Sequence, residues 1–237
     1  MATFSLLTPT IYVHDTDLTS YCNKLTLKAE AAELDNTPFG ATYRTRIGGL
    51  KTAGFDFDGF WESTPDLANF STLGSSGQVA TISPAGTEAA TAYFLQTGRF
   101  TYEEFGAIGT VTPFMVSTRN TGNNGLIRGQ LAKAKGTVSA TGQLGSICTI
   151  TGPTATQFLY ASLNIFIAAT TITVTVESAA TIGFAGPTLR ATFGPLTAVG
   201  GTFLARVAGP FTDGFWRFNV TVCTGTFTVA GAIGVGS

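Results

Sequence analysis

Alternation of apolar and polar residues is the strongest structural signal in this chain, and it predicts β-strands. In residues 22–31, apolar residues recur at every second position, namely Leu25, Leu27, Ala29 and Ala31. A repeat of two places these side chains on one face of a strand. We therefore predict a strand over residues 22–31 with one buried face and one face that is wet or contacts a partner.

A second strand is predicted over residues 51–61, KTAGFDFDGFW. Phe55 and Phe57 share one face, and Asp56 and Asp58 share the other. The stretch between the two strands, residues 33–50, is polar and contains glycines, and we expect it to be too long for a hairpin turn. Ordered loops of that length are often functional, so a long functional loop is predicted here.

One helix is predicted directly after the second strand. Ser63-Thr64-Pro65-Asp66 combines an N-cap candidate, a first-turn proline and an acid. Leu67, Phe70 and Leu73 follow at helical spacing, and Gly74 is the expected stop. Further strands are predicted at residues 78–82, 99–104, 109–117 and 126–135, whereas residues 89–96 fit either a short helix or a strand.

The second part of the chain differs in character from the first. A turn-rich segment at residues 120–125 and a change in composition predict two domains, residues 1–137 and residues 138–237. In residues 171–176, threonine alternates with isoleucine and valine, and other short strands are separated by Gly/Pro turns. Such regular short strands are typical of a β-sandwich or jelly roll. The predicted fold class is mainly β, with one flanking helix in the first domain.

The tetrapeptide DGFW occurs twice, at residues 58–61 and 213–216, and holds the only two tryptophans. The first copy closes a strand and leads to a helix. The second is expected to open a strand that leads to a hairpin, with Trp216 in the core. Because a true repeat would keep its context, we interpret the repetition as chance.

Charge and composition narrow the function classes. Only 11% of residues are charged, against a usual value of about one quarter. Either neighbouring subunits cover much of the surface, or threonine and serine coat it. Residues 1–120 hold 12 acids and 7 bases, a net charge of −5, and residues 121–237 hold 2 acids and 6 bases, a net charge of +4. Neither half has a basic cluster, which argues against sequence-specific nucleic-acid binding.

No pattern in the chain predicts catalysis, a cofactor or a metal. The single histidine, His14, has no nucleophile partner, and GxSxG, P-loop, GxGxxG and zinc spacings are absent from the sequence. Asp56 and Asp58 could bind a hard cation, but pairing with Lys24 or Lys28 across the strands is the simpler interpretation. We therefore expect no enzyme activity.

The cysteines and the N-terminal residues indicate the cellular compartment in which the protein is expected to reside. The three cysteines, Cys22, Cys148 and Cys223, are far apart and form no CxxC, so we expect buried free thiols in a reducing compartment. The start, MATFSLLTPT, lacks the basic residues and long apolar core of a signal peptide, and no membrane-spanning segment is predicted.

The predicted long loop is the best candidate for a subunit contact. It is either a solvated loop or an arm that reaches a neighbouring subunit, where aromatic residues and arginines are favoured. The low overall charge favours the arm. The residues expected to contact another subunit are Asp35, Phe39, Tyr43, Arg44, Arg46 and Lys51.

Two segments of the first part resemble the tail tube (major tail) proteins of long-tailed bacteriophages. They are DLTSYCNKLTLKAEAAELDNTPFGATYRTRIGGLKTAGFDFDGFWE and AYFLQTGRFTYEEFGAIGTVTPFMVS. The pattern is a strand, an A-E-L-D-x-T-x-F-G segment, and an R-x-R-x-x-G-L-K return into a second strand. The C-terminal stretch from TVTVESAATIG onward is similar to a β-sandwich found in several phage virion proteins. Many tail tube proteins have only the first domain, so the second departs from the pattern.

The resemblance implies a tail-tube-type β-sandwich or barrel with one flanking helix, plus a second, jelly-roll-like β-sandwich. Six subunits, or three if both domains share the wall, would form a ring. Rings would stack into a tube that conducts DNA, with the long loop reaching the adjacent ring and Asp56 and Asp58 facing the lumen. The expected location is the virion tail, assembled in the host cytoplasm, with copies of itself and other tail proteins as partners and no membrane.

Two other functions stay open at this point. The chain could be another virion component, such as a capsid or tail decoration protein. It could also be a carbohydrate-binding module, because jelly rolls with an exposed tryptophan often bind sugars. Trp216 shares its strand face with apolar residues, which argues against the second alternative.

Overall fold

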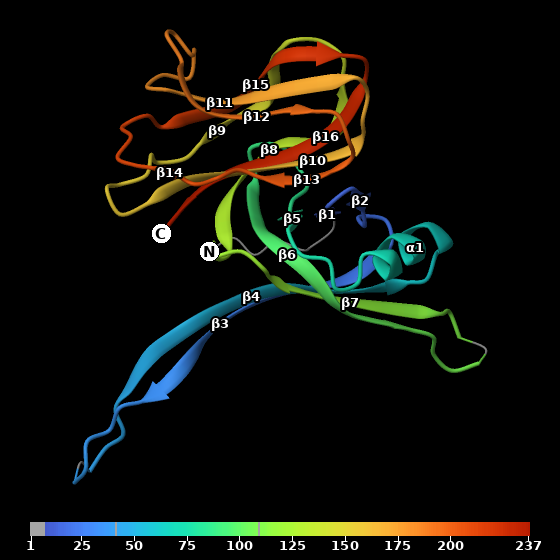
Figure 1. The fold of residues 1–237 in the computed structure, drawn as a ribbon, viewed down its shortest axis with the longest axis vertical. Coiled ribbons are helices and arrows are strands. Elements are labelled where there is room, and N and C mark those ends of the chain that lie inside the picture. Colours follow the sequence, from blue (N-terminus) through green and yellow to red (C-terminus); the bar gives the residue numbers. More distant parts are fainter. Residues whose placement is uncertain (1–7, 41, 109) are drawn as a thin grey trace.

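Antiparallel β-sheets make up almost the whole molecule, as a computed structural model shows (Figure 1). The model describes residues 8–40, 42–108 and 110–237. One sheet has twelve strands, and the other has four in the order β12-β11-β15-β9. A single short helix flanks the larger sheet, so the predicted fold class is confirmed.

The lower part of the molecule in Figure 1 contains the first strands and the helix. In chain order these elements are β1 (Thr10–Val13), β2 (Thr16–Asp17), β3 (Cys22–Asp35), β4 (Arg46–Phe60), α1 (Ser63–Ser71), β5 (Gln78–Ser83), β6 (Thr91–Glu104) and β7 (Pro113–Asn120). Strand β8 (Ile127–Val138) pairs with β6 and continues into the upper part, where it pairs with β16.

The upper part is a sandwich of the four-stranded sheet and one end of the larger sheet (Figure 1). Its elements are β9 (Gly142–Thr149), β10 (Phe158–Ile167), β11 (Thr171–Ala179), β12 (Thr188–Leu196), β13 (Gly200–Phe203), β14 (Val207–Ala208), β15 (Phe215–Thr224) and β16 (Phe227–Gly236).

Apolar side chains from both sheets fill the sandwich. Trp216 and Phe218 on β15 are fully buried and pack in one cluster with Phe227 on β16. The Trp216 indole nitrogen donates to the carbonyl oxygen of Ile150 at 2.8 Å, which satisfies its only polar group. The predicted core position of Trp216 is therefore confirmed.

The larger sheet continues across the predicted domain boundary. Strand β8 ends at Val138, where Val138 pairs with Phe227 of β16, while β8 also pairs with β6 of the first part. A buried hydrogen bond of 2.9 Å joins Thr81 on β5 to Asn164 on β10. The two parts thus share a sheet and buried contacts, and the division at residue 138 stays a prediction.

Most predicted strands are present, with longer bounds. The alternative at residues 89–96 is resolved as a strand, because β6 begins at Thr91. Helix α1 begins at Ser63 as a helical residue, with Glu62 rather than Ser63 at the N-cap, and it ends before Gly74. The expected start of a strand at Gly109 and residues 1–7 lie outside the described residues.

Two sequence predictions are wrong. Residues 33–50 are not a long loop, because β3 and β4 pair directly up to Asp35 opposite Arg46 and leave only residues 36–45 as a turn. The strand opened by the second DGFW copy does not form a hairpin with the next strand. β15 belongs to the four-stranded sheet and β16 to the larger one, so the chain crosses the sandwich between them.

Among the described residues, no helix combines the length and the hydropathy that crossing a membrane requires.

Candidate assembly surfaces

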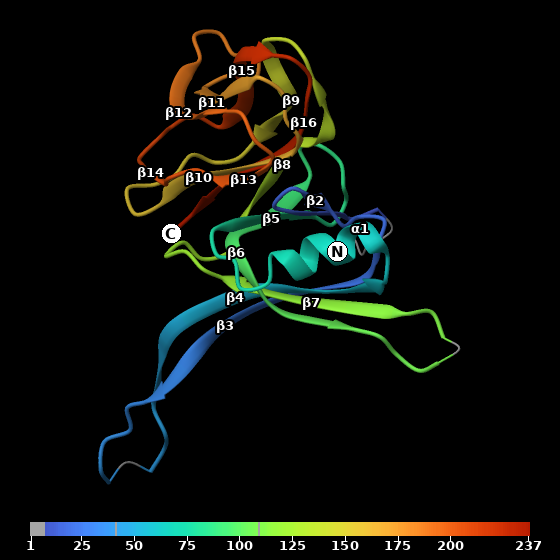
Figure 2. The ribbon, with the colours of Figure 1, turned by 45° about the vertical axis from the view of Figure 1, so that its right-hand side comes forward.

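The β3–β4 hairpin extends far beyond the body of the molecule (Figures 1 and 2). Strand β4 pairs with β7 only over residues 56–60, so β3 and β4 continue from there as a ribbon of two strands. We call residues 29–53 the arm. A two-stranded ribbon is marginally stable alone in water, and it gains stability when a further surface covers it.

Hydrogen bonds of the arm's own residues order its tip. The Asp35 carboxylate accepts the backbone N–H of Thr37 at 2.9 Å and the Thr37 hydroxyl at 2.5 Å. These bonds lower the pKa of Asp35. The Thr37 hydroxyl oxygen also accepts the backbone N–H of Thr45 at 2.9 Å. Asp35 therefore shapes the turn rather than projecting freely toward a partner.

Large apolar side chains on the arm lie in solvent. Leu34 and Ile47 are directly paired across the ribbon, and each keeps about half of its surface exposed (50% and 52%). Leu50 is 86% exposed, and Phe39 and Tyr43 at the tip are almost wholly exposed. Soluble monomers rarely expose a continuous set of large apolar side chains, which marks the arm as an interaction surface.

The predicted contact residues with positive charge also lie on the arm. Arg44 and Lys51 are exposed, and among the described residues neither forms an ion pair. Arg46 forms a 2.9 Å ion pair with Glu33, and both side chains are more than half exposed. The structure thus brings the six predicted contact residues together on one arm.

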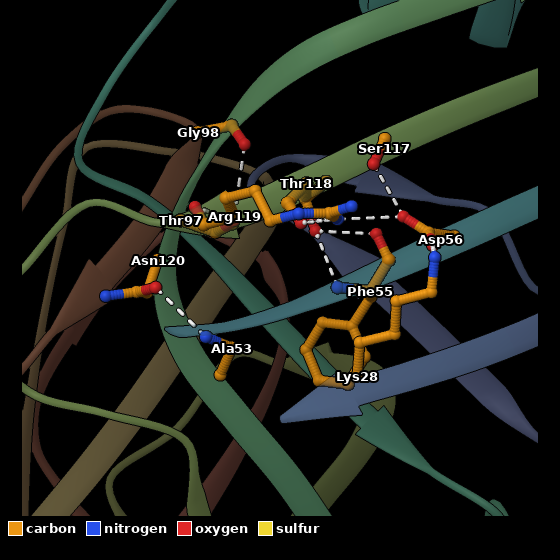
Figure 3. A network of polar contacts seen from close by, with 10 residues as sticks. All are labelled: Lys28, Ala53, Phe55, Asp56, Thr97, Gly98, Ser117, Thr118, Arg119 and Asn120. Carbon is orange, nitrogen blue, oxygen red and sulfur yellow. Dashed lines mark hydrogen bonds and ion pairs between the residues drawn. The ribbon is translucent and has the colours of Figure 1, made fainter. Parts of the chain in front are cut away.

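Asp56 stands at the base of the arm in a dense polar network (Figure 3). Its carboxylate pairs with Lys28 at 2.6 Å and with Arg119 at 2.8 Å, and it accepts the Ser117 hydroxyl at 2.5 Å. Partial burial on its own would raise its pKa. The bonds from Arg119, Lys28 and Ser117 outweigh burial and lower the pKa of Asp56 to about 2.

Side chains of β7 also hold the backbone of β4 at this point (Figure 3). The Thr118 hydroxyl accepts the N–H of Phe55 at 3.1 Å and donates to its carbonyl oxygen at 3.0 Å. The Asn120 side-chain oxygen accepts the N–H of Ala53 at 3.1 Å. Gly54 permits this close approach, because a Cβ there would lie 2.0 Å from the Thr118 carbonyl oxygen. The arm is therefore fixed firmly at its base.

The predicted cross-strand pairing of the two aspartates is confirmed. Asp58 pairs with Lys24 at 2.6 Å, as Asp56 does with Lys28. Among the described residues, no group of three or more His, Cys, Asp or Glu side chains could hold a metal ion. That Asp56 and Asp58 face a lumen stays a prediction.

A second exposed apolar surface lies on helix α1. Leu67 and Phe70 are 68% and 66% exposed, and Leu73, just beyond the helix, is 45% exposed. The buried side of the helix instead carries Asn69, which is 1% exposed. An apolar stripe at helical spacing normally faces a core, and here it faces outward.

Arg99 explains why the helix docks through its polar side. This residue is 1% exposed, and its guanidinium donates to the Ala68 carbonyl oxygen at 2.7 Å and to the Thr72 hydroxyl. A further bond of 3.4 Å reaches the Val13 carbonyl oxygen. Burial lowers the pKa of Arg99 to about 10, which still leaves it charged at neutral pH. The cation also lies at the helix C-terminus, where the helix dipole favours it.

Acidic and apolar residues continue this surface onto the β6–β7 turn. The Tyr102 hydroxyl donates to Asp66 at 2.5 Å and to Glu104 at 3.1 Å, which joins the turn to the helix. Burial and these two carboxylates raise the pKa of Tyr102. We call this region the helix-end surface. Its members are Glu62, Asp66, Leu67, Phe70, Leu73, Glu104, Phe105, Ile108 and Val111, whereas Glu103 lies on the opposite face of the sheet, in register with Met115 and Asp58.

His14 and the three cysteines are the side chains considered above for chemistry, and the structure places them in packing and hydrogen-bonding roles. His14 is half-buried, with its Nδ1 accepting the N–H of Gly201 at 2.9 Å, and burial lowers its pKa. The three cysteines are free, as predicted, but only Cys148 is fully buried. Burial raises the pKa of Cys22 and of Cys148 to about 12, so both are protonated at neutral pH.

Comparison with known proteins gives little guidance. No protein-family model matches the chain, and no curated protein matches it. One solved structure with some similarity is described as the virion of a native gene transfer agent particle, with a TM-score of 0.43 and 11% sequence identity. The match covers 52% of this chain and 98% of that chain. A similarity at this level does not establish a shared function.

Proposed function

We propose that this chain is a structural virion protein whose copies assemble into stacked rings and form the tail tube of a long-tailed bacteriophage. The observation that carries the proposal is the arm. It is a firmly anchored ribbon of two strands that exposes Leu50, Phe39 and Tyr43 to solvent. Such a ribbon gains its stability when a second copy covers it. The resemblance of residues 17–62 to tail tube proteins supports the same proposal.

Ring closure would use the open edges of the larger sheet. Among the described residues, β3 pairs only with β4, so its other edge has unpaired backbone groups over Cys22–Asp35. Long open edges are templates for pairing with another chain. Six copies, or three if both parts of the chain form the wall, would close a ring in this way. The arm would then reach the adjacent ring.

The face that carries Asp56 and Asp58 would line the lumen. On this face, Lys24, Lys28 and Arg119 accompany Asp56 and Asp58, and Glu30 lies farther along β3. Glu103 also lies on this face, in register with Met115 and Asp58, so four acids and three bases leave it with little net charge. DNA would meet a surface with little net charge and would slide along it, because phosphates bind tightly only where many basic groups gather.

Electron microscopy of the purified protein tests the proposal. We expect rings with sixfold or threefold symmetry, and tubes at high protein concentration. A decoration protein would instead bind capsids or finished tails without forming tubes, and a carbohydrate-binding module would stay monomeric and bind glycans. Either of those results would contradict the proposal.

A further inference from the structure

The arm needs a receiving surface on another copy, and the helix-end surface has the complementary character. We propose that the arm of one copy docks on the helix-end surface of the next copy, so that copies associate head to tail. This inference rests on the proposed function, since it names the surface of the neighbouring copy that receives the arm.

The shape of the molecule requires two copies for this contact. The arm and the β6–β7 turn project at different ends of the larger sheet, as both views show (Figures 1 and 2). The arm is anchored at its base by Asn120 and Thr118, so it cannot fold back to its own helix. Contact between two different surfaces of identical chains is heterologous, and it builds rings or open-ended assemblies rather than closed dimers.

Charge on the two surfaces is complementary. The helix-end surface holds the acids Glu62, Asp66 and Glu104. Arg99 is the only base between residues 52 and 118, and it is 1% exposed and engaged with the helix. Among the described residues, none of these acids forms an ion pair. On the arm, Arg44 and Lys51 are the bases that form no ion pair among the described residues. The arm also carries three acids, of which Glu33 is paired with Arg46, Asp35 is bonded to Thr37 within the turn, and Glu30 lies near the base of the arm.

Apolar groups on the two surfaces match as well. The arm presents Phe39, Leu34, Ile47 and Leu50, and the helix-end surface presents the stripe on α1 with Phe105 and Ile108 beyond it. Interfaces typically combine an apolar centre that holds aromatic residues with a polar rim. Each surface has both parts, and covering one with the other removes two exposed apolar sets from water at once.

Site-specific photocrosslinking tests this contact directly. A photoreactive phenylalanine analogue at position 39 replaces a side chain that is fully exposed and touches no core residue. In assembled protein, we expect crosslinks between copies to residues 60–75 or 102–112. The same analogue at Ile182, an exposed position in the upper sandwich, is the control and should not label these segments.

The outcomes separate this inference from the proposed function. Rings or tubes whose position 39 crosslinks to any other part of the neighbour would overturn the docking and leave the proposed function standing. Protein that forms no assembly at any concentration, and therefore no crosslink between copies, would overturn both.

Charge reversal provides an independent measurement. Arg44→Glu or Glu62→Arg alone should raise the protein concentration needed for assembly at least tenfold, because each places like charges at the contact. A mixture of the two variants should assemble near the wild-type concentration. When copies of the two variants alternate, every contact again brings opposite charges together. The control Arg206→Glu reverses an exposed base in the upper sandwich, outside both surfaces, and should leave the assembly concentration unchanged. A mixture that assembles no better than either variant would contradict the proposal.

Discussion

Single residues at the base of the arm determine how firmly it is held. Asp56 is the central one, with two cationic partners and a hydroxyl donor, and its side chain is only 14% exposed. Asp58 has a single partner, Lys24, whose side chain is 67% exposed. The two aspartates look equivalent in the sequence, but their energetic roles differ, because exposed pairs contribute little.

Removing one carboxylate at a time tests that difference. Asp56→Asn should lower the free energy of unfolding by about 1–2 kcal/mol, since a partly buried network loses its charge. Asp58→Asn is the matched control and should change the free energy of unfolding by less than about 0.5 kcal/mol. Urea denaturation measures both values. Equal losses from the two variants would contradict the role assigned to Asp56.

Acid should weaken the same network. The pKa of Asp56 falls from 3.8 to about 2 in the folded protein, so its contribution to stability is complete above pH 4 and disappears as the pH drops from 4 through 2. Melting temperatures measured from pH 6 down to pH 2 should therefore decline less steeply in Asp56→Asn than in wild type. Parallel declines in the two proteins would show that Asp56 titrates normally.

At the scale of elements, the arm and helix α1 both expose apolar residues while polar bonds fix their attachment. Alternation in the sequence predicts strands at residues 22–31 and 51–61 and the pairing of Lys24 and Lys28 with the two aspartates. The continuation of β3 and β4 as a paired ribbon through residues 32–35 and 46–50 is not predicted, because this stretch is polar and contains glycines, and the ribbon has a register shift between Ala31 and Glu33. Neither feature has a clear sequence signal.

The helix-end surface also could not be predicted from the sequence. Leu67, Phe70 and Leu73 were recognised as a helical stripe, but such a stripe normally faces a core. Only the three-dimensional structure places Arg99 beneath the helix, and arginine is rarely fully buried. Glu104 joins this surface through the Tyr102 hydroxyl, which also bonds Asp66 of the helix, and these contacts link residues far apart in the sequence.

Arg99→Met tests how the helix is attached. Methionine keeps much of the buried stem but removes the bonds to Ala68 and Thr72. We expect a loss of about 1–3 kcal/mol in the free energy of unfolding and faster amide exchange across α1. Arg44→Met, at an exposed arm position, is the control and should leave both measurements unchanged. Normal exchange in α1 of Arg99→Met would contradict the account of its docking.

Deleting residues 35–48 tests the arm as an element. The removed residues make no contact with the core, so the melting temperature should stay within a few degrees of wild type. The shortened protein should nevertheless form no tubes at any concentration. Long tubes from this variant, seen by electron microscopy, would show that the arm is not needed for polymerisation.

At the scale of the whole molecule, the chain has two exposed and unlike surfaces at different ends and a sheet with an open edge. The larger sheet runs through both parts of the chain. With only 11% of its residues charged, the protein lacks the charge that usually keeps such surfaces apart. These features are the ones expected of the proposed subunit, whose stability would be completed by other copies.

Amide hydrogen exchange, measured at increasing protein concentration, tests that claim most directly. In dilute protein the amides of residues 29–53 should exchange rapidly, because the ribbon is covered by nothing. On assembly these amides should exchange at least tenfold more slowly, while those of the upper sandwich should hardly change. Equal exchange in the arm at every concentration, from a chain that stays monomeric, would contradict the account.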